Sequence, residues 1–261
     1  MIGRFRTILG VRFFTGSALE AVEFGLGGGL VVVPSAPVLV GMETDGALRM
    51  AVQDADLAIA DSGLMVLLWR FFGRQRIPRT SGLAYLSILL GRSEIREPNA
   101  TFWIMPNAAA WDRAARWLKG KGISARDEDC YVAPLYPSGE IADLTLVKLL
   151  ERRRPLHVIV CVGGCVQERL GYSLKHSLNY RPGIHCIGAA IGFLSGDQVR
   201  IPTWADRLFL GWLFRCLSDP RRFVPRYWRA ARLVTLIWRF RERAPGGIGS
   251  ARMGDSRVSG N

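Results

Sequence analysis

The sequence predicts an α/β fold: a Rossmann-like, mostly parallel sheet flanked by helices, with a basic helical appendage at the C-terminal end. Short apolar runs recur along the chain, segments with helical spacing separate them, and polar or glycine-rich residues follow the runs. This alternation is typical of βαβ units around a buried parallel sheet. The chain has 261 residues, of which 49% are hydrophobic, so it can bury a sizeable core.

The predicted strands are short apolar runs that fit buried positions in a parallel sheet. They cover residues 30–33, 57–60, 101–105, 158–162 and 185–187. The predicted helices lie between these runs, and each is long enough to cover one face of the sheet. They cover residues 45–53, 64–72, 83–90, 108–119 and 141–153.

The N-terminal region carries no predicted targeting or membrane-spanning segment. Arg12 interrupts the apolar run of the first sixteen residues, so we expect no secretory signal. The longest uncharged stretch, residues 25–42, contains two prolines and five glycines, which argues against a spanning helix. Four of these glycines precede a predicted strand instead of following one, so we predict a turn and not a dinucleotide-binding fingerprint. They are Gly25, Gly27, Gly28 and Gly29.

Positive charge is concentrated at the C-terminal end. The formal net charge is +13, and residues 200–243 contain eleven arginines against Asp206, Asp219 and Glu242. We therefore divide the chain into an α/β core at 1–198, a basic membrane-proximal appendage at 199–243, and a Gly- and Ser-rich tail at 244–261 that is predicted to be disordered. One apolar face of the appendage is predicted to comprise Ala230, Leu233, Val234, Ile237 and Phe240, flanked by Arg229, Arg232 and Arg239.

A basic patch of this kind fits nucleic acid, anionic lipid or a diphosphate substrate. Eight aromatic residues accompany the arginines, and amphipathic rings are favoured at a lipid headgroup boundary. Stacking on single-stranded nucleic acid also uses aromatic rings, so that alternative stays open. We favour an anionic membrane surface over nucleic acid. The rings are those of Trp204, Trp212, Phe214, Phe223, Tyr227, Trp228, Trp238 and Phe240.

The five cysteines are odd in number and mostly embedded in apolar runs, which predicts reduced thiols in a cytoplasmic protein. Cys161 and Cys165 are four residues apart, but no histidine or second cysteine pair accompanies them, so we expect no zinc site. The three histidines, His157, His176 and His185, show no metal-ligand spacing and are interpreted as structural. The sequence thus predicts neither a metal nor a cofactor.

Ligands of open α/β sheets bind outside the carboxyl ends of the strands, so the residues that follow each apolar run are the first candidates for a site. Asp61 and Gln167 stand out among them as polar residues after two different predicted strands. The full set is Ser35, Asp61, Pro106, Asn107, Gly163, Gly164, Gln167, Glu168 and residues 188–192.

Four motifs, in their order along the chain, are similar to those of the WecG/TagA/CpsF glycosyltransferases (glycosyltransferase family 26). They are ADLAIADSG at 55–63, RTSG at 79–82, VGGCVQE at 162–168, and the segment 187–228. The last is the most specific, because it keeps the family's spacing of Pro202, Trp204, Trp212, Arg215, Pro220, Arg221 and Tyr227. The resemblance extends from about residue 31 to residue 227.

This resemblance implies an inverting glycosyltransferase at the inner face of the cell membrane. The expected reaction moves a sugar, N-acetylmannosamine-type or related, from a UDP-sugar to a polyprenyl-diphosphate-linked acceptor in cell-surface polysaccharide synthesis such as cell wall or exopolysaccharide. It also implies an appendage that contacts the membrane and catalysis without a metal. A catalytically inactive homologue that acts as a membrane-associated scaffold is the alternative, and a homo-oligomer stays open.

The resemblance assigns catalysis to three residues. Asp61 corresponds to the family's aspartate and suits a general base, while a helix N-cap is the ordinary alternative for an Asp before Ser62 and Gly63. Arg215 and Arg221 would neutralise the leaving diphosphate. Lipid-headgroup contact or a solvated basic face is the alternative for each appendage arginine.

Substrate binding is assigned to residues of the last three motifs. For Gln167 and Glu168 the alternative is a hydrogen bond that braces a loop, and for Arg79 it is a surface ion pair. The predicted substrate-binding residues are Arg79, Gly82, Gly163, Gln167, Glu168, Gly188, Arg222 and Arg226.

The sequence departs from the family's pattern at several polar positions. These departures indicate either a different donor sugar or a homologue that has lost its chemistry, and the retained site residues favour a working transferase. The altered positions are Val33, Ser35, Ala84, Pro106, Asn107, Cys165, Val166, Gly192 and Gly211.

Overall fold

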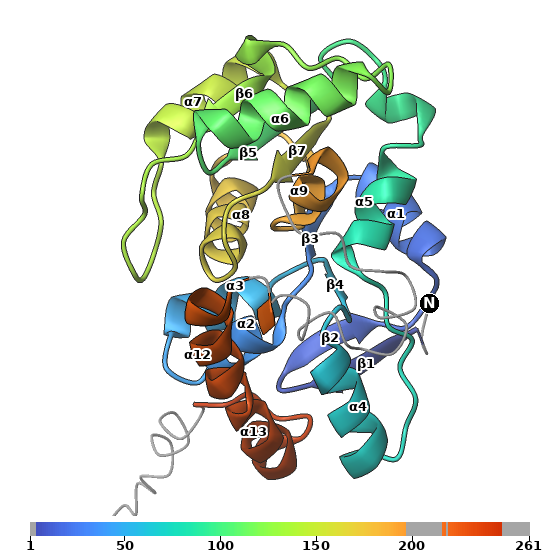
Figure 1. Cartoon of the computed structure of the whole chain (residues 1–261), viewed down its shortest axis with the longest axis vertical. Helices are drawn as coiled ribbons and strands as arrows, with labels where there is room; N and C mark the ends of the chain where they lie inside the picture. Colours follow the sequence, from blue (N-terminus) through green and yellow to red (C-terminus); the bar gives the residue numbers. More distant parts are fainter. Residues whose placement is uncertain (1–3, 197–215, 218, 247–261) are drawn as a thin grey trace, which may run out of the picture.

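The computed structural model describes residues 4–196, 216–217 and 219–246 (Figure 1). In this part of the chain, eight strands form one mixed sheet in the order β1-β2-β4-β3-β8-β7-β5-β6. All neighbouring pairs are parallel except β1 with β2, which form an antiparallel hairpin. The strands are β1 (Phe5–Ile8), β2 (Val11–Phe14), β3 (Gly29–Val32), β4 (Leu57–Ile59), β5 (Thr101–Met105), β6 (Cys130–Val132), β7 (His157–Val160) and β8 (Gly183–Cys186).

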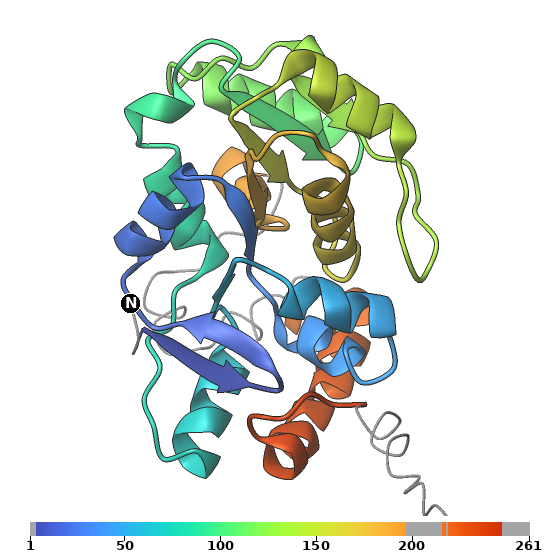
Figure 2. The same ribbon diagram turned by 180° about the vertical axis from the view of Figure 1, so that it is seen from behind.

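Helices cover both faces of the sheet (Figures 1 and 2), which confirms the predicted α/β, Rossmann-like fold. On one face lie α1 (Ala18–Leu26), α5 (Gly82–Leu89), α6 (Ala108–Lys119) and α9 (Ala190–Ser195). On the other face lie α2 (Ala36–Gly41), α3 (Gly46–Gln53), α4 (Gly63–Phe72), α7 (Leu144–Arg153), α8 (Val166–Ser177), α12 (Pro220–Ala230) and α13 (Arg232–Phe240).

Each central strand supplies both layers of the core. In β5, Phe102 and Ile104 pack against the helices of one face, whereas Trp103 and Met105 pack against those of the other. Successive side chains of a strand point to opposite faces, so a strand that is covered on both sides is apolar throughout. This is why the central strands of this sheet appear in the sequence as continuous apolar runs.

The predicted strands and helices are confirmed with small shifts at their ends, and β5 and α6 have the predicted bounds. The prediction missed the N-terminal hairpin, the strand β6 and the helices α1, α2, α8 and α9. The two prolines of residues 25–42 do not break a helix, because Pro37 lies in the first turn of α2, where no amide hydrogen bond is lost. The predicted glycine turn is shorter than expected: Gly25 lies inside α1, and Gly27 and Gly28 form the turn before β3.

The helices α12 and α13 pack against α2 and α4. Leu233, Leu236 and Ile237 of α13 are buried and belong to the same core layer as α4. The predicted apolar face was wrong at Val234, which is exposed, because the helical period instead buries Leu236. Arg232 forms an ion pair with Glu43 at 2.8 Å. Among the helices that the structure describes, none is long and apolar enough to cross a lipid bilayer.

The segment after α13 returns to the N-terminal hairpin. The amides of Leu9 and Gly10, in the β1–β2 turn, donate hydrogen bonds to the carbonyl oxygens of Arg241 and Glu242 at 2.7 and 2.8 Å. Arg49 of α3 donates to the carbonyl of Pro245 at 2.9 Å. The first residues of the predicted tail are thus held on the core, and those from 247 onward lie outside the described residues.

Candidate active site

The carboxyl ends of β4, β3, β8, β7 and β5 lie side by side, because these strands are consecutive in the sheet and parallel. The predicted site residues that follow four of these strands therefore meet at one edge. Asp61 follows β4, Ser35 follows β3, Gly188 follows β8, and Gly163 follows β7. With a strand spacing of about 4.8 Å, the ends of β4 and β8 are separated by roughly 10 Å.

Asp61 is not the N-cap of the helix that follows it. Ser62 takes that position, and its hydroxyl accepts a hydrogen bond from the amide of Met65 at 3.2 Å. The N-cap alternative for Asp61 was therefore wrong, because the helix begins one residue later than that alternative requires. The Asp61 side chain is 31% exposed at the strand end.

Arg79 and the start of α5 fix the position of Asp61. Arg79 donates from Nε to the carbonyl oxygen of Asp61 at 2.8 Å, and its Nη2 lies 3.7 Å from Oδ1 of the same residue. The amide of Gly82, the first residue of α5, donates to Oδ1 at 3.4 Å. A carboxylate at a helix N-terminus is favoured by the helix dipole, so this geometry holds a negative charge at the strand end.

Gly82 joins Asp61 to the neighbouring strands. A methyl group added at Gly82 would stand 3.4 Å from Cγ1 of Val33, which follows β3, and 3.6 Å from the carbonyl oxygen of Ile187, which follows β8. The absence of a side chain thus lets α5 begin directly on the strand ends. Of the predicted site residues, Asp61, Arg79 and Gly82 form one contact group, and Ile187 leads from it to Gly188.

Gln167 and Gly188 form the second half of the site. Gln167, in the first turn of α8, is 4% exposed and donates from Nε2 to Oε1 of Glu168 at 2.9 Å. Its Oε1 is buried and has no hydrogen-bond partner among the described residues. Gly188 has φ +61°, and a methyl group there would stand 3.4 Å from that oxygen. A buried acceptor without a partner is costly unless a ligand or water pairs with it.

Glu168 holds the start of α8 together. Its Oε2 accepts a hydrogen bond from the amide of Cys165 at 2.7 Å, and its Oε1 accepts from Gln167. Cys165 has φ +73°, a strained conformation for a residue with a side chain, and the fully buried Glu168 stabilises it. The contacts of Glu168 are those of a residue that braces a loop. One oxygen of Gln167, Oε1, has no hydrogen-bond partner among the described residues.

Gly163 lies open at the end of β7. A methyl group added there would meet no atom within 4 Å, and its carbonyl accepts hydrogen bonds from the amides of Val166 and Gln167. The N-terminus of α8, a helix of twelve residues, thus begins beside an exposed glycine. The amides of Cys165, Val166 and Gln167 already donate to Glu168 and Gly163, so what the exposed glycine offers a ligand is room beside the helix start.

The appendage arginines are described only in part. Arg221 lies exposed on α12, which packs against α2, the helix that follows the end of β3. Arg222 and Arg226 belong to the backbone of α12, but their side chains are outside the described set, as is the whole of Arg215. The helix α12, which carries Arg221, Arg222 and Arg226, therefore packs on the helix that follows the carboxyl end of β3.

The comparison with protein families gives one match. The model of the glycosyl transferase WecG/TagA/CpsF family matches residues 6–246. The chain belongs to this family. A curated relative is the N-acetylglucosaminyldiphosphoundecaprenol N-acetyl-beta-D-mannosaminyltransferase of Bacillus subtilis (strain 168). It is 32% identical over 98 residues, which are 35% of this chain and 38% of the relative's own length.

In this member of the WecG/TagA/CpsF family, the altered positions that the structure describes differ in their surroundings. Val33 is buried against Gly82, Gly192 is buried in α9, and Ser35 precedes α2 without a capping hydrogen bond. Ala84 is exposed in the first turn of α5. Gly211 lies outside the described residues.

Sequence reasoning missed Arg169, a buried side chain that holds the start of α8 in place. This buried arginine donates from Nε to the carbonyl of Cys165 at 2.9 Å and from Nη1 to the carbonyls of Pro137 and Gly139. It ties the strained start of α8 to the long loop between β6 and α7. The signal that could have indicated it is a lone arginine directly after Gln167 and Glu168, in a segment that the structure shows to be helical.

Two of the three histidines, His157 and His185, and two of the five cysteines are buried. All five cysteines are free thiols, and Cys161 and Cys186 are buried, which raises the pKa of both thiols. No group of three or more potential metal ligands occurs in the described part of the chain. Tyr85, His185 and His157 form a buried chain: the Tyr85 hydroxyl lies 2.8 Å from Nδ1 of His185, whose Nε2 lies 3.3 Å from Nδ1 of His157.

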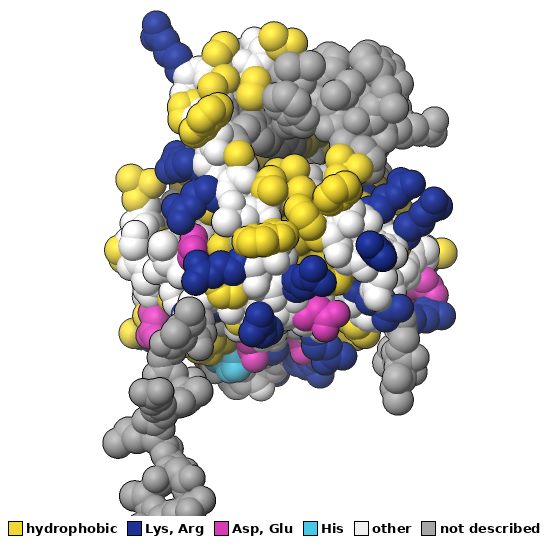
Figure 3. Space-filling model, turned by 90° about the horizontal axis from the view of Figure 1, so that it is seen from below, with side chains coloured by type: hydrophobic (Ala, Val, Ile, Leu, Met, Phe, Trp, Pro, Cys, Tyr) yellow, Lys and Arg dark blue, Asp and Glu magenta, His cyan; other side chains and the backbone are white. Residues whose placement is uncertain are grey.

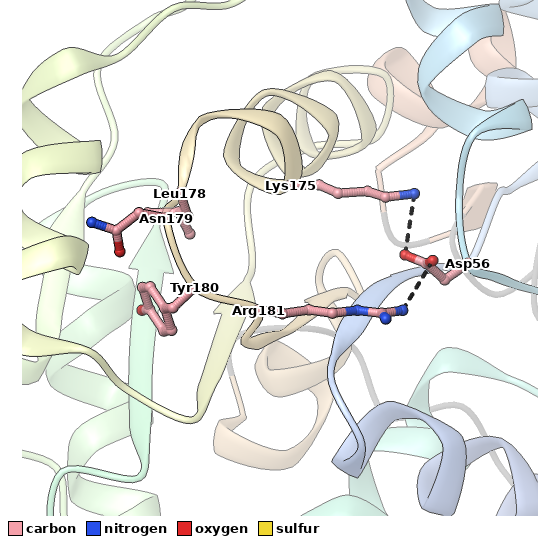
Figure 4. A pocket seen from close by; sticks show the side chains of 6 residues that line it. All are labelled: Asp56, Lys175, Leu178, Asn179, Tyr180 and Arg181. Carbon is pink, nitrogen blue, oxygen red and sulfur yellow. Dashed lines mark hydrogen bonds and ion pairs between the residues drawn. The ribbon is translucent and has the colours of Figure 1, made fainter.

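A surface hollow of about 650 Å³ lies at the opposite, amino edge of the sheet, next to the segment that precedes β8. Figure 4 shows Lys175 and Arg181 pointing toward Asp56, with which both form ion pairs, at 3.2 and 3.3 Å. Asp56 also accepts a hydrogen bond from the amide of Leu30 at 2.8 Å. The charged side chains of this hollow are thus paired with one another and hold β3 beside its neighbours. We therefore place the candidate active site at the carboxyl edge of the sheet.

Proposed function

We propose that this protein is an inverting glycosyltransferase that moves a sugar from a UDP-sugar to a polyprenyl-diphosphate-linked acceptor. One observation carries the proposal: the group of Asp61, Arg79 and Gly82 at the end of β4 and the pair Gly188 and Gln167 at the ends of β8 and β7 lie along the same edge of the sheet. Membership of a glycosyltransferase family over most of the chain supports the reaction class.

Asp61 is the proposed general base. The acceptor hydroxyl attacks the anomeric carbon of the donor sugar from the face opposite the nucleotide, and its proton passes to the carboxylate of Asp61. The bond between the anomeric carbon and the diphosphate oxygen breaks, and UDP leaves with the electron pair. Arg79 and the amide of Gly82 keep the carboxylate in place, which is the positioning that such a base requires.

The donor is proposed to lie over the ends of β7 and β8. The unpaired Oε1 of Gln167 can accept a hydrogen bond from a hydroxyl or N–H group of the donor. The bare backbone at Gly163 and Gly188 leaves room for the diphosphate near the start of α8. Arg215, Arg221, Arg222 and Arg226 would neutralise the charge that develops on the leaving group, since a guanidinium offers paired donors to phosphate oxygens.

The acceptor is proposed to be held at an anionic membrane surface on the cytoplasmic side. The name of the Bacillus subtilis relative gives an undecaprenol-diphosphate-linked N-acetylglucosamine as its acceptor and N-acetylmannosamine as the transferred sugar. An N-acetylmannosamine-type or related donor is therefore the first to test here. The loss of polar groups at Val33 and Gly192 favours a donor with fewer hydrogen-bonding groups in that region, because unmatched polar groups are rejected strongly.

The decisive experiment measures UDP release from a panel of UDP-sugars, with a short-chain polyprenyl-diphosphate-linked sugar as the acceptor. We expect release above the background hydrolysis rate with one donor, and release that depends on the acceptor. Calorimetry with the same donors is the companion measurement. If no donor binds and none is turned over, the protein is a scaffold and the proposed reaction is wrong.

A further inference from the structure

One side of α4 is apolar and faces outward. Leu64, Leu67 and Phe71 are spaced by three and four residues, so they share one side of the helix. All three are exposed, and Phe71 is 76% exposed. The other side of α4, with Met65 and Trp69, packs into the core. The exposed stripe is therefore additional to the apolar side that the fold itself needs.

The helix beside α4 has a similar outer side. α13 packs against α4, and its Val234 and Trp238, four residues apart, are exposed, Trp238 to 62%. Figure 3 shows apolar side chains gathered among Lys and Arg side chains, at the end of the molecule where Figure 1 places α4 and α13. We call the exposed apolar residues of these two helices the α4–α13 face.

Arginines border the α4–α13 face, and acidic residues are absent from its helices. Arg70, Arg74 and Arg76 are exposed in or just after α4, and Arg239 is exposed on α13. No Asp or Glu occurs in the sequence of α4, α12, α13 or the segment 73–81. Among the described residues, no carboxylate forms an ion pair with Arg70, Arg74 or Arg76. Near α13, Glu43 is paired with Arg232 and Glu242 is exposed, so the border is arginine-rich without being purely basic. Exposed large apolar side chains with an arginine-rich border are complementary to an anionic lipid surface.

We infer that the α4–α13 face docks on an anionic lipid bilayer, so that α4, a helix of the α/β core, is a membrane-binding element alongside the basic appendage. The apolar tips insert among the headgroups while the arginines contact lipid phosphates. Charge selects this occupant: the arginine-rich border suits an anionic bilayer, whereas two copies of the chain would bring arginines together.

The position of α4 connects this surface to the proposed chemistry. Asp61 is followed directly by Ser62, the N-cap of α4, so the proposed base and the lipid-facing stripe belong to one β4–α4 unit. From Leu64 to Phe71 the helix rises by about 10 Å. A bilayer at this face would thus bring a lipid-linked acceptor close to Asp61, and this functional link rests on the proposed transferase activity.

The test is sedimentation of the full chain with two kinds of vesicles, phosphatidylcholine alone and equal parts phosphatidylcholine and phosphatidylglycerol. Wild-type protein should bind the anionic vesicles more strongly. The double variant Leu67→Ser with Phe71→Ser should bind the anionic vesicles at least about tenfold more weakly. It lacks two large apolar side chains whose transfer from water into the bilayer would stabilise binding. The matched control is Leu144→Ser with Leu156→Ser, two exposed leucines near the other end of the sheet, and it should bind as wild type does.

The contribution of the arginines that border the α4–α13 face is tested with a second double variant. Arg70→Gln with Arg74→Gln should weaken binding to the anionic vesicles by about fivefold for each arginine and leave binding to phosphatidylcholine unchanged. Lys148→Gln with Arg152→Gln, on the exposed side of α7, removes the same net charge from another surface and is the control. Equal loss in both pairs would mean that only net charge matters, and would overturn the assignment of the face.

The outcomes separate this inference from the proposed function. If the α4 variants bind vesicles as wild type does, the inference is wrong, and UDP release with a short-chain acceptor can still occur. If vesicle binding depends on α4 but no donor is turned over, the inference holds and the proposed reaction fails. If the Leu67 and Phe71 variant instead changes the molar mass from dimer to monomer with vesicle binding unchanged, a second copy covers the face and the inference is overturned.

Discussion

Gly188 lies against the side-chain amide of Gln167, so that a methyl group added at Gly188 would stand 3.4 Å from the unpaired Oε1 of Gln167. The two residues come from the neighbouring units β7–α8 and β8–α9, and the missing side chain at residue 188 leaves space beside this buried oxygen. The backbone at Gly188 has φ +61°, a region that favours glycine.

The first prediction is that Gly188→Ala weakens donor binding. The added methyl group crowds Oε1 of Gln167, and the positive φ costs about 1 kcal/mol of folding free energy. We expect a KM for the donor raised by about tenfold, equivalent to about 1.4 kcal/mol, measured by UDP release. Gly139→Ala is the matched control, since Gly139 has φ +89° and a methyl group there meets nothing within 4 Å. The control should show the loss of stability with an unchanged KM.

The second prediction is that Asp61→Asn abolishes most of the transfer. An amide cannot take the proton of the acceptor hydroxyl, and general-base catalysis contributes about 10²–10⁴ in rate. We expect kcat to fall within that range while donor binding, measured by calorimetry, changes little. Ser62→Ala is the neighbouring control: it removes the cap of α4 and costs about 1 kcal/mol of stability, but the rate should be retained. Full activity of Asp61→Asn would remove Asp61 from the mechanism.

The third prediction concerns stability in acid. Burial lowers the pKa of His185 to about 3, and the neighbouring His157 adds to that effect. In the unfolded chain the imidazole has a pKa near 6.5. The contribution of His185 to stability is therefore complete above pH 6.5 and is lost as the pH falls toward 3, at up to about 1.4 kcal/mol per pH unit.

The measurement is urea unfolding between pH 4 and pH 8 for wild type and His185→Gln. Glutamine removes the titrating ring, so the slope of the free energy of unfolding against pH below 6.5 should be smaller in the variant. His176→Gln, at an exposed position beside Asp54, is the control and should keep most of the wild-type slope. Identical slopes for wild type and His185→Gln would contradict the prediction.

The fourth prediction is that Arg169→Lys loosens the loop between β6 and α7. A lysine cannot reproduce the fork that reaches Cys165 on one side and Pro137 and Gly139 on the other. We expect a loss of about 2–3 kcal/mol of folding free energy, because hydrogen bonds from a charged donor are lost in a buried position. Limited proteolysis should cut residues 133–143 faster. Arg153→Lys, in a surface ion pair with Glu128, should show neither effect.

Most of the α/β frame could be predicted because the buried strands are apolar on both faces. β5 and α6 were predicted with the observed bounds, since a continuous apolar run is followed there by Asn107, whose side chain caps the helix. The hairpin β1–β2 could not be recognised. Its two strands are only four residues long, which is too short for the alternation of exposed Arg6 and Arg12 with less exposed residues to be noticed. The glycines around α8 hide the helical period of that segment.

The sequence could name candidate site residues, which stay predictions, but it could not indicate how they are arranged. Asp61 and Gln167 were identified because they follow strands, and that position does not depend on long-range contacts. The support of Asp61 by Arg79 and the start of α5 depends on how the loop 73–81 returns to β4, which no local pattern indicates. The roles of the appendage arginines and of the predicted domain division stay predictions.

The hydrogen bonds between the β1–β2 turn and the segment after α13 have a consequence for protein synthesis and for engineering. The amides of Leu9 and Gly10 emerge from the ribosome early, but the carbonyls of Arg241 and Glu242 that they bind emerge almost a full chain later. The hairpin can therefore reach its final hydrogen bonding only after translation of α13. A C-terminal fusion partner placed directly after residue 240 would displace those carbonyls and disturb the opposite end of the polypeptide.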